Sequence, residues 1–358
     1  DWIWVGIAIG AGFLSKYSAM YQIICLLLFM LFWKPARQYL RRPGPYLALL
    51  IVLLCTIPVI VWNAQHGWIT LRHVSQNAGL DKEFQWTTRF LVDFVVSEVF
   101  LLNPIFLIGG LWAWIALAQQ KFRTPLSVYL FWMGGAVLIG HLFYTLHSRV
   151  FPNWIAPAIV PLLCAAAVFW DQRWRDGASQ VKSWLAAGII IGAIPIILLH
   201  DTNLITKLAG KPLPANLDPL RRVRGWRQTA AAVGAARESL LAEGKPVFII
   251  GAHYGLVGEI SFYLPEARAR VSDTPLVYYQ SSETPENQFY FWPGYQSHVG
   301  ENAIYVREEK PTEPISPRLE KEFDSITDLG VREIEYRGRI FRTLHLCACR
   351  NLHANGTN

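Results

Sequence analysis

The chain has 358 residues, of which 53% are hydrophobic and only 16% are charged. Soluble domains carry about 25% charged residues, so a single water-soluble globule is excluded. The net charge of +7 lies entirely in residues 1–200, and because these basic residues flank apolar runs they do not indicate a nucleic-acid partner.

Residues 1–200 contain seven apolar stretches that predict membrane-spanning helices. Most have about 17–21 residues, which at 1.5 Å per residue crosses a hydrocarbon core of about 30 Å. Backbone polar groups cannot stay unpaired in lipid, so each stretch is expected to be helical. Buried helices of a soluble protein would not need so many runs with so few charges between them. The stretches are 2–14, 17–33, 45–62, 99–117, 126–146, 153–170 and 183–199.

The basic connections between these stretches predict the orientation of the chain. They lie at alternate ends of successive helices and therefore on one side, which the positive-inside rule makes cytoplasmic. Residues 63–89, 147–152 and 201–358 are then expected on the periplasmic side of a bacterial inner membrane. The basic residues are Lys34, Arg37, Arg41, Arg42, Lys121, Arg123, Arg173, Arg175 and Lys182.

The second part of the chain predicts a small α/β domain at residues 219–350, after a linker at 201–218 and before a disordered tail at 351–358. Helices are expected at 226–242 and 254–263, and strands at 246–251, 276–279, 303–306 and on both sides of 337–339. Gly251, Gly255 and Gly258 follow a strand and open a helix. Their spacing is not that of a dinucleotide-binding turn, so close packing is expected there and not a nucleotide.

The five cysteines are not expected to carry chemistry. Cys25, Cys55 and Cys164 lie in apolar stretches and act as small hydrophobic residues. Cys347 and Cys349 form a single CxC, which offers too few ligands for zinc. We therefore expect no metal site and no cofactor, and the sequence does not support a divalent metal.

Three clusters of polar residues lie beside the apolar stretches on the predicted periplasmic side. An ionisable group near a membrane span is a functional candidate. Lys16 lies where the first two stretches meet, and it either binds a lipid phosphate or simply extends to the interface from a helix end. Together Lys16, Arg72 and Arg149 suit an anionic head group, whereas Asp93 and Glu98 are expected at the interface. The remaining cluster residues are Asn63, His66, His73, His147 and Asn153.

Five segments resemble one known family. They are 10–17 (GAGFLSKY), 58–68 (PVIVWNAQHGW), 147–157 (HSRVFPNWIAP), 258–265 (GEISFYLP) and 337–352 (RGRIFRTLHLCACRNL). In this order they resemble the bacterial polyprenyl-phosphate-sugar glycosyltransferases of the GT-C superfamily, which are relatives of protein O-mannosyltransferase and aminoarabinose transferase (glycosyltransferase family 39-like). The implied fold is a polytopic helical membrane core at residues 1–200 followed by a small periplasmic α/β domain.

The resemblance also implies a reaction and its partners. Such enzymes move a sugar from a polyprenyl phosphate to an acceptor hydroxyl on a protein, lipid A or another glycan, with inversion at the anomeric carbon, in contact with membrane lipid. By resemblance, Lys16 and Tyr17 approach the lipid phosphate, Arg149 lines the same cavity, and the family's catalytic acidic residue lies ahead of Asp1. The alternatives are a flippase or other transporter of lipid-linked sugars, which favours broken helices and midplane charges, and a non-catalytic membrane scaffold.

Overall fold

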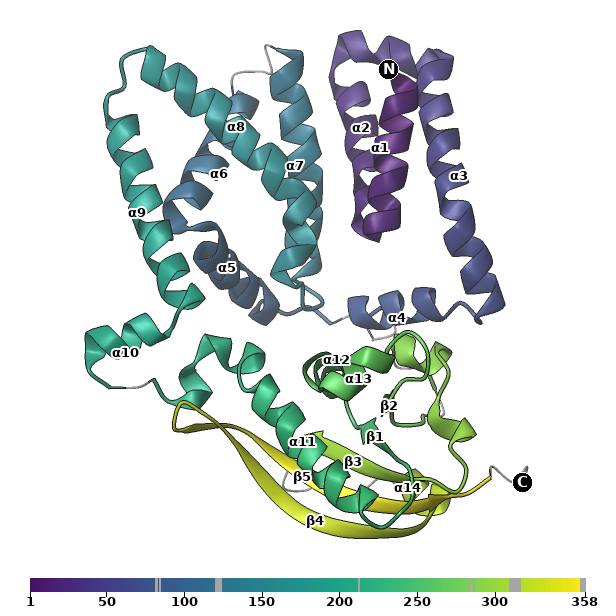
Figure 1. Cartoon of the computed structure of the whole chain (residues 1–358). Helices are drawn as coiled ribbons and strands as arrows, with labels where there is room; N and C mark the ends of the chain where they lie inside the picture. Colours follow the sequence, from purple (N-terminus) through teal and green to yellow (C-terminus); the bar gives the residue numbers. More distant parts are fainter. Residues whose placement is uncertain are drawn as a thin grey trace. The chain divides into compact units, whose positions relative to one another are not determined.

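The computed structural model describes residues 1–80, 83, 85–119, 124–211, 213–282, 284–285, 287–308 and 317–354. The chain divides into two units, Asp1–Pro195 and Ile196–Asn358, which we describe separately as unit 1 and unit 2 (Figure 1). Unit 1 is helical, and unit 2 contains the sheet.

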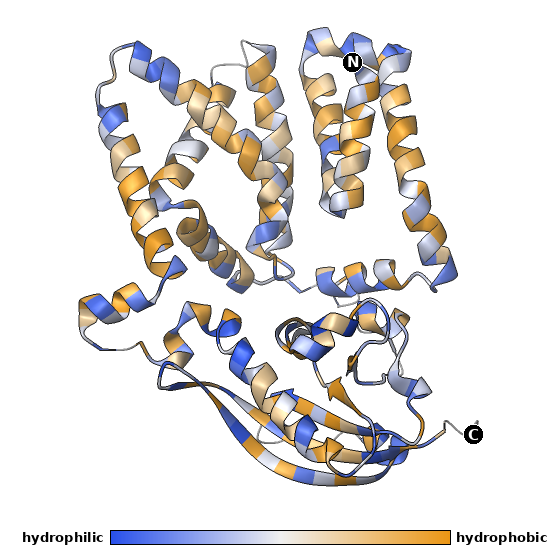
Figure 2. Ribbon diagram, viewed as in Figure 1, coloured by the Kyte–Doolittle hydropathy of each residue, from blue (hydrophilic) through white to orange (hydrophobic). Residues whose placement is uncertain are grey.

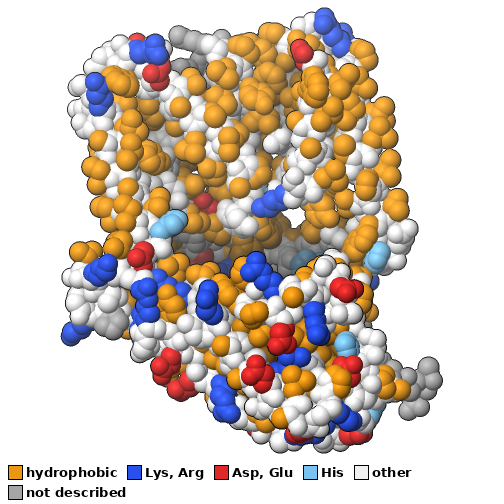
Figure 3. Space-filling model, viewed as in Figure 1, with side chains coloured by type: hydrophobic (Ala, Val, Ile, Leu, Met, Phe, Trp, Pro, Cys, Tyr) orange, Lys and Arg blue, Asp and Glu red, His pale blue; other side chains and the backbone are white. Residues whose placement is uncertain are grey.

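Apolar helices make up unit 1, and their outward surfaces are hydrophobic (Figures 2 and 3). Within the described ranges, four helices are long and apolar enough to cross a membrane, and up to six if each of two bent pairs counts as one span. The predicted polytopic helical fold is confirmed, although the first helix has only 14 residues. The helices are α1 (Trp2–Ser15), α2 (Tyr21–Phe32), α3 (Pro43–Gln65), α4 (Ile69–Ala78), α5 (Arg89–Leu102), α6 (Pro104–Gln119), α7 (Pro125–Tyr144), α8 (Ala156–Arg175) and α9 (Gln180–His200), with short 3₁₀ turns η1 (Tyr17–Met20), η2 (Lys34–Arg41) and η3 (Pro152–Ile155).

The apolar stretch 99–117 is not one helix, so that prediction is wrong. Helices α5 and α6 meet at 106°, at Asn103, whose φ is 67°. Pro104 disfavours a helical conformation at the residue before it and supplies no backbone N–H. The Asn103 side chain accepts from the Ile105 N–H (3.0 Å) and donates to the Gly188 carbonyl (2.6 Å), so the break is satisfied inside the protein.

Two glycines allow α1 and α3 to pack closely. A Cβ built on Gly6 would lie 2.7 Å from the Ala48 carbonyl oxygen, and one on Gly10 would lie 2.6 Å from the Cys55 Sγ. Small residues four apart on one helix face permit this approach in membrane proteins. The earlier glycine, Gly6, contacts the earlier residue of α3, Ala48, and the later glycine, Gly10, contacts the later one, Cys55. The two helices therefore run in the same direction.

The connections of unit 1 alternate between its two ends. Figure 1 shows the α2–α3 and α8–α9 connections at one end, and the α1–α2, α3–α4 and α7–α8 connections at the other. The first two carry Lys34 to Arg42 and Arg173 to Lys182, as the basic-residue pattern predicted. Lys121 and Arg123 lie outside the described residues.

Unit 2 is a five-stranded mixed sheet in the order β2-β1-β3-β5-β4. Strand β1 is parallel to β2 and β3, β5 is antiparallel to β3 and β4, and β4 forms an edge with register shifts at Asp328/Gly330 and Ile334/Glu335. The small α/β domain is confirmed. Its elements are α10 (Asn203–Ala209), η4 (Ala215–Leu217), η5 (Pro219–Val223), α11 (Trp226–Leu241), β1 (Val247–Gly251), α12 (Tyr254–Tyr263), α13 (Pro265–Arg270), β2 (Val277–Tyr279), η6 (Gln288–Phe291), η7 (Tyr295–Ser297), β3 (Asn302–Glu308), α14 (Pro317–Glu322), β4 (Phe323–Tyr336) and β5 (Arg339–Leu352).

Each face of the sheet has its own hydrophobic core. On one face Ile249 and Ile304 pack with Val233 of α11 and Ile260 of α12. On the other, Phe248 packs with aromatic side chains and with Cys347 and Cys349. Strand β1 is buried along its whole length because it lies between two parallel neighbours and under both cores.

Ordered structure extends into two segments that were predicted to be irregular. The predicted linker 201–218 contains α10 and ends at the buried Asp218, which accepts from the Thr202 hydroxyl (3.0 Å) and pairs with Arg224 (2.8 Å). Strand β5 continues to Leu352, two residues into the predicted tail, and residues 355–358 lie outside the described part. The buried partners of Asp218 and the sheet hydrogen bonds of β5 order these segments.

Gly251 has the packing role expected from the sequence. A Cβ there would lie 2.8 Å from the Val257 Cγ2, whereas nothing lies within 4 Å of a Cβ on Gly258. His253 caps the start of α12 by accepting from the Gly255 N–H (3.0 Å). The expected close packing is therefore confirmed at Gly251, where β1 contacts α12, and is wrong at Gly258.

Candidate functional site

Lys16 and Asn153 bring two of the three predicted clusters into contact. Lys16 is the extended residue between α1 and η1, and its ammonium group donates to the Asn153 carbonyl over 3.3 Å. The two residues are 137 positions apart in the chain. The turn before α2 and the turn before α8 therefore meet at the end of unit 1 away from the basic connections (Figure 1).

Lys16 lies well inside the end of α3. Gly6 contacts Ala48 and Ile51, and Gly10 contacts Val52 and Cys55, so Lys16 lies level with the segment 58–61 of α3. Helix α3 continues to Gln65, which at 1.5 Å per residue is about 6–10 Å further along its axis.

Tyr17 and Arg149 border the same turns and are both exposed. The Tyr17 ring is 41% exposed and packs 5.0 Å from the Phe13 ring. The Arg149 guanidinium lies 5.2 Å over the Phe151 ring, in the segment that leads to Asn153. Arg149 is therefore held by a cation–π contact, which leaves its N–H groups available to an anion.

The second cluster has structural contacts of its own. Asn63 is buried, donates to the Val59 carbonyl (2.9 Å) and accepts from the Thr70 N–H (3.1 Å), so it ties α3 to α4. His66 stacks on Trp62, with ring centroids 4.2 Å apart. The hydrogen bonds of Asn63 serve helix packing and not a ligand.

Arg72, His73 and His147 complete the predicted set. Arg72 and His73 lie on the exposed surface of α4, where Asn77 contacts the His73 Nε2 (2.9 Å). His147 accepts from the Gln85 N–H over 3.4 Å. The three cations Lys16, Arg72 and Arg149 thus do not form one buried cluster, since all three are exposed.

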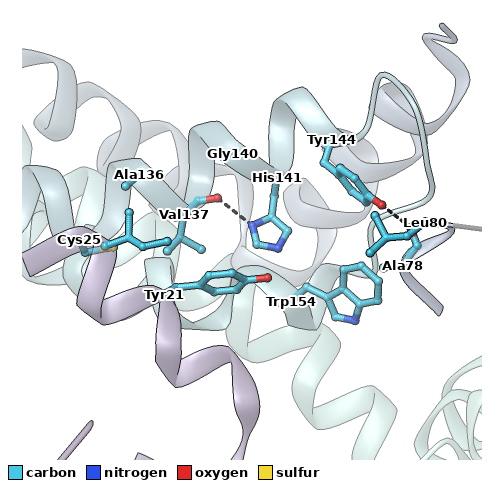
Figure 4. A pocket seen from close by; sticks show the side chains of 11 residues that line it. Tyr21, Cys25, Ala78, Leu80, Ala136, Val137, Gly140, His141, Tyr144 and Trp154 are labelled. Carbon is cyan, nitrogen blue, oxygen red and sulfur yellow. Dashed lines mark hydrogen bonds between the residues drawn. The ribbon is translucent and has the colours of Figure 1, made fainter. Parts of the chain in front are cut away.

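Unit 1 contains a pocket of about 360 Å³ (Figure 4). Its walls come from α2, α7, the end of α4 and the turn η3, and they are mostly apolar. Trp154, the neighbour of Asn153, is one of the lining residues, and Tyr21 lies at the start of α2. Such walls suit a hydrocarbon chain, and through Trp154 the pocket shares the turn that contacts Lys16.

His141 is the polar residue of this pocket that the sequence analysis missed. It is 7% exposed, and its Nδ1 lies 2.8 Å from the Val137 carbonyl oxygen, which can only accept a hydrogen bond. Nδ1 therefore carries the proton, and in the neutral ring Nε2 is the acceptor. The sequence does contain a feature that could have identified His141, because an ionisable residue inside the predicted apolar stretch 126–146 is a functional candidate.

Glu98 is the second missed residue, and its position contradicts the predicted interfacial one. It is 5% exposed, and among the described residues its Oε1 has no hydrogen-bond partner. Asp93, one turn earlier, is exposed as expected. A buried carboxyl group without a partner is costly, so Glu98 is a functional candidate in unit 1.

One group of possible metal ligands, Asp328, His345 and Cys347, lies within the described part of unit 2. Arg307 donates to the His345 Nδ1 (3.1 Å), so the His345 Nε2 carries a proton and donates to Asp328 (2.7 Å). Burial raises the pKa of the Cys347 thiol to about 11. Both ring nitrogens are already used and the thiol stays protonated, so the group is not prepared for a metal.

Comparisons with known proteins give two similarities. Residues 1–62, which include Lys16 and Tyr17, match the family model of dolichyl-phosphate-mannose-protein mannosyltransferase. The lipid A galacturonosyltransferase RgtD of Rhizobium johnstonii is 23% identical over 177 residues, which cover 48% of this chain and 36% of that protein. No solved structure matches.

Both similarities fit a glycosyltransferase of the GT-C superfamily, which confirms the resemblance found in the sequence motifs. With the apolar helices, they support a multi-pass membrane glycosyltransferase of this type. The match spans only about a third of the length of the curated relative.

Proposed function

We propose that this chain takes part in transferring a sugar from a polyprenyl phosphate to an acceptor hydroxyl on a protein, lipid A or another glycan. The observation that carries the proposal is the Lys16–Asn153 contact, because it joins a cation to the turn that also supplies Trp154 to an apolar pocket. A polyprenyl phosphate has the matching chemistry, since a hydrocarbon chain and a phosphate are adjacent in one molecule.

In this proposal the donor phosphate binds between the turns of Lys16 and Arg149. The ammonium of Lys16 and the guanidinium of Arg149 neutralise the phosphate, and the first isoprene units lie against the apolar walls near Trp154. The carbonyl of Asn153 orients the Lys16 side chain before the donor binds.

The reaction is a single displacement at the anomeric carbon. The acceptor oxygen forms a bond to that carbon while the bond to the phosphate oxygen breaks, and the electron pair leaves with the polyprenyl phosphate. The anomeric configuration inverts, and a general base takes the acceptor proton. Lys16 and Arg149 stabilise the negative charge that grows on the phosphate, which lowers the barrier.

The proposed location is the bacterial inner membrane, with residues 201–358 in the periplasm. The positions of Lys34 to Arg42 and of Arg173 to Lys182 at one end of unit 1 support this orientation. A reporter fused after residue 300 would test it, and activity of a cytoplasm-specific reporter there would overturn it.

The substitutions Lys16→Met and Arg149→Met in the full-length protein test the proposed transfer. Each variant deletes one charge and is expected to lose about 2–4 kcal/mol of transition-state stabilisation, or about 30- to 1000-fold in turnover of polyprenyl-phosphate sugar. Lys34→Met is the matched control, because Lys34 lies at the other end of α2 and should leave turnover unchanged. Rates like those of the control in both site variants would overturn the proposed phosphate site.

A further inference from the structure

Unit 2 contains a pocket of about 630 Å³ that the proposed transfer does not use. It opens beyond the carboxyl end of β2, where the chain continues through Gln280, Ser281 and Ser282. The segment around η6 and helix α14 supply the other walls. Ligands of open α/β sheets bind at this end of the strands.

Aromatic rings form one wall of this pocket. Trp292 is 54% exposed and Tyr290 is 42% exposed. The Phe289 ring lies edge-on to the Trp292 ring, with centroids 5.0 Å apart, and stacks on the Tyr279 ring, with centroids 6.0 Å apart. Packing against Phe289 therefore holds Trp292 in place. The electron-rich face of an aromatic ring attracts the weakly positive C–H groups on the face of a sugar.

A hydrogen-bonded carboxylate lies at the base of the opposite wall. Glu322 accepts from the Ser281 hydroxyl (2.5 Å) with one oxygen and from the buried Tyr295 hydroxyl (2.6 Å) with the other. Burial raises the pKa of Tyr295, so the phenol remains a donor. Glu322 is thus satisfied internally, and it holds the Arg318 Nε at 3.7 Å.

Arg318 lines the pocket with a side chain that is 42% exposed. Its Nε faces Glu322, and the planar guanidinium can also donate to an anion. Lys321 and His353 line the same pocket. The His353 Nε2 lies 2.5 Å from the Asp324 carboxylate, and this hydrogen bond raises the pKa of the ring.

We propose that this pocket binds a saccharide that carries an anionic group, with the sugar face on Trp292 and Tyr290 and the anionic group on Arg318. The lining has the cations Arg318 and Lys321, together with His353, and one internally paired carboxylate, which favours an anion over a cation. The planar guanidinium suits a carboxylate or a phosphate equally, and the experiment separates these two.

The test uses the full chain in detergent, with saturation-transfer NMR titrations of D-glucuronate, D-glucose 6-phosphate, D-glucose and inorganic phosphate. We expect one of the two anionic sugars to bind at least about tenfold more tightly than glucose and than phosphate, because it alone uses both walls. Equal binding of glucose would overturn the role of Arg318, and equal binding of inorganic phosphate would overturn the role of the aromatic wall.

Variants assign the binding to the pocket. Trp292→Ala and Tyr290→Ala should each weaken binding of the anionic sugar about tenfold, and Arg318→Gln should remove its advantage over glucose. Tyr254→Ala and Arg332→Gln are matched controls, since both residues are exposed elsewhere in unit 2. Unchanged binding in all three pocket variants, or no binding by the unsubstituted chain, would overturn the proposal.

The site is independent of the proposed transfer reaction. Lys16→Met should leave the NMR titration unchanged, because Lys16 belongs to unit 1. Loss of turnover in Lys16→Met with retained sugar binding supports both proposals separately, whereas loss of both in that variant would contradict the independence of the pocket.

Discussion

The guanidinium of Arg342 lies 3.5 Å from the centre of the Trp226 ring, although Arg342 is in β5 and Trp226 begins α11. Arg342 is only 6% exposed. The guanidinium N–H groups of Arg342 donate to the backbone carbonyls of Arg224 (2.6 Å) and Arg222 (2.8 Å) and to the Glu308 carboxylate (3.1 Å). One side chain therefore joins the segment before α11 to the sheet.

Arg342→Met should destabilise unit 2 by about 2–4 kcal/mol, because it leaves two carbonyls and Glu308 without their donor and removes the cation–π contact. Pulse proteolysis in urea would measure this in the full chain. Arg332→Met, at an exposed position of β4, should stay within about 0.5 kcal/mol of the unsubstituted protein. A loss no larger than that of this control would show that Arg342 does not connect the two segments.

Gly10→Val should destabilise unit 1 by about 1–3 kcal/mol, since its side chain would meet Cys55 and force α1 away from α3. Thermal unfolding in detergent would measure the change. Gly140→Ala, where nothing lies within 4 Å of the new Cβ, is the matched helical control. Equal melting temperatures for the two variants would contradict the close approach of α1 and α3.

Cys347 and Cys349 should resist alkylation by iodoacetamide in the folded protein. Both thiols are buried, at 1% and 0% exposure, and burial raises the pKa of both, that of Cys347 to about 11. The reactive thiolate is therefore rare at pH 7.5. Mass spectrometry should find both residues unmodified until denaturant is added, and rapid modification of the native protein would contradict their burial.

His353 and Asp324 should make the stability of unit 2 depend on pH on both sides of neutrality. The hydrogen bond to Asp324 raises the pKa of His353, and the same bond lowers the pKa of Asp324. The stabilisation by His353 is complete below its unfolded pKa of about 6.5 and is lost as pH rises through the folded pKa. The stabilisation by Asp324 is present above its unfolded pKa of about 3.9 and is lost as pH falls through the folded pKa.

An NMR titration of the His353 ring would measure this pair directly. The folded pKa should lie above 6.5, and Asp324→Asn should return it toward that value. A His353 pKa that does not respond to Asp324→Asn would show that the pair does not form in solution.

The sequence predicted the elements of unit 2 closely, because their boundaries have local causes. Predicted helix 254–263 and strand 246–251 match α12 and β1 to within one residue. An apolar run bounded by Pro246 and Gly251 identifies a buried strand without knowledge of its neighbours. The order of the strands in the sheet could not be predicted, since it depends on pairings between distant segments.

The candidate site could be predicted only in part. The pattern of basic connections indicated that the turns of Lys16 and Arg149 share one end of the helices, but the contact with Asn153 depends on how α1, α2, α7 and α8 pack. The bend at Asn103 was missed because hydropathy does not report backbone direction. His141 was overlooked because the apolar residues around it dominated the pattern, and Glu98 was placed at the interface because the sequence does not show which side chains the helix packing buries.

Strand β4 limits how copies of this protein can meet in a membrane. Proteins that share a bilayer are concentrated laterally, so exposed strands of neighbouring copies would meet more often than in solution. Among the described strands β4 pairs only with β5, with two register shifts in that pairing, and it carries the exposed charges of Arg332, Glu333 and Glu335. Charges and bulges at an edge prevent strand pairing between molecules. The sheet can therefore remain monomeric at the high lateral density that a membrane imposes.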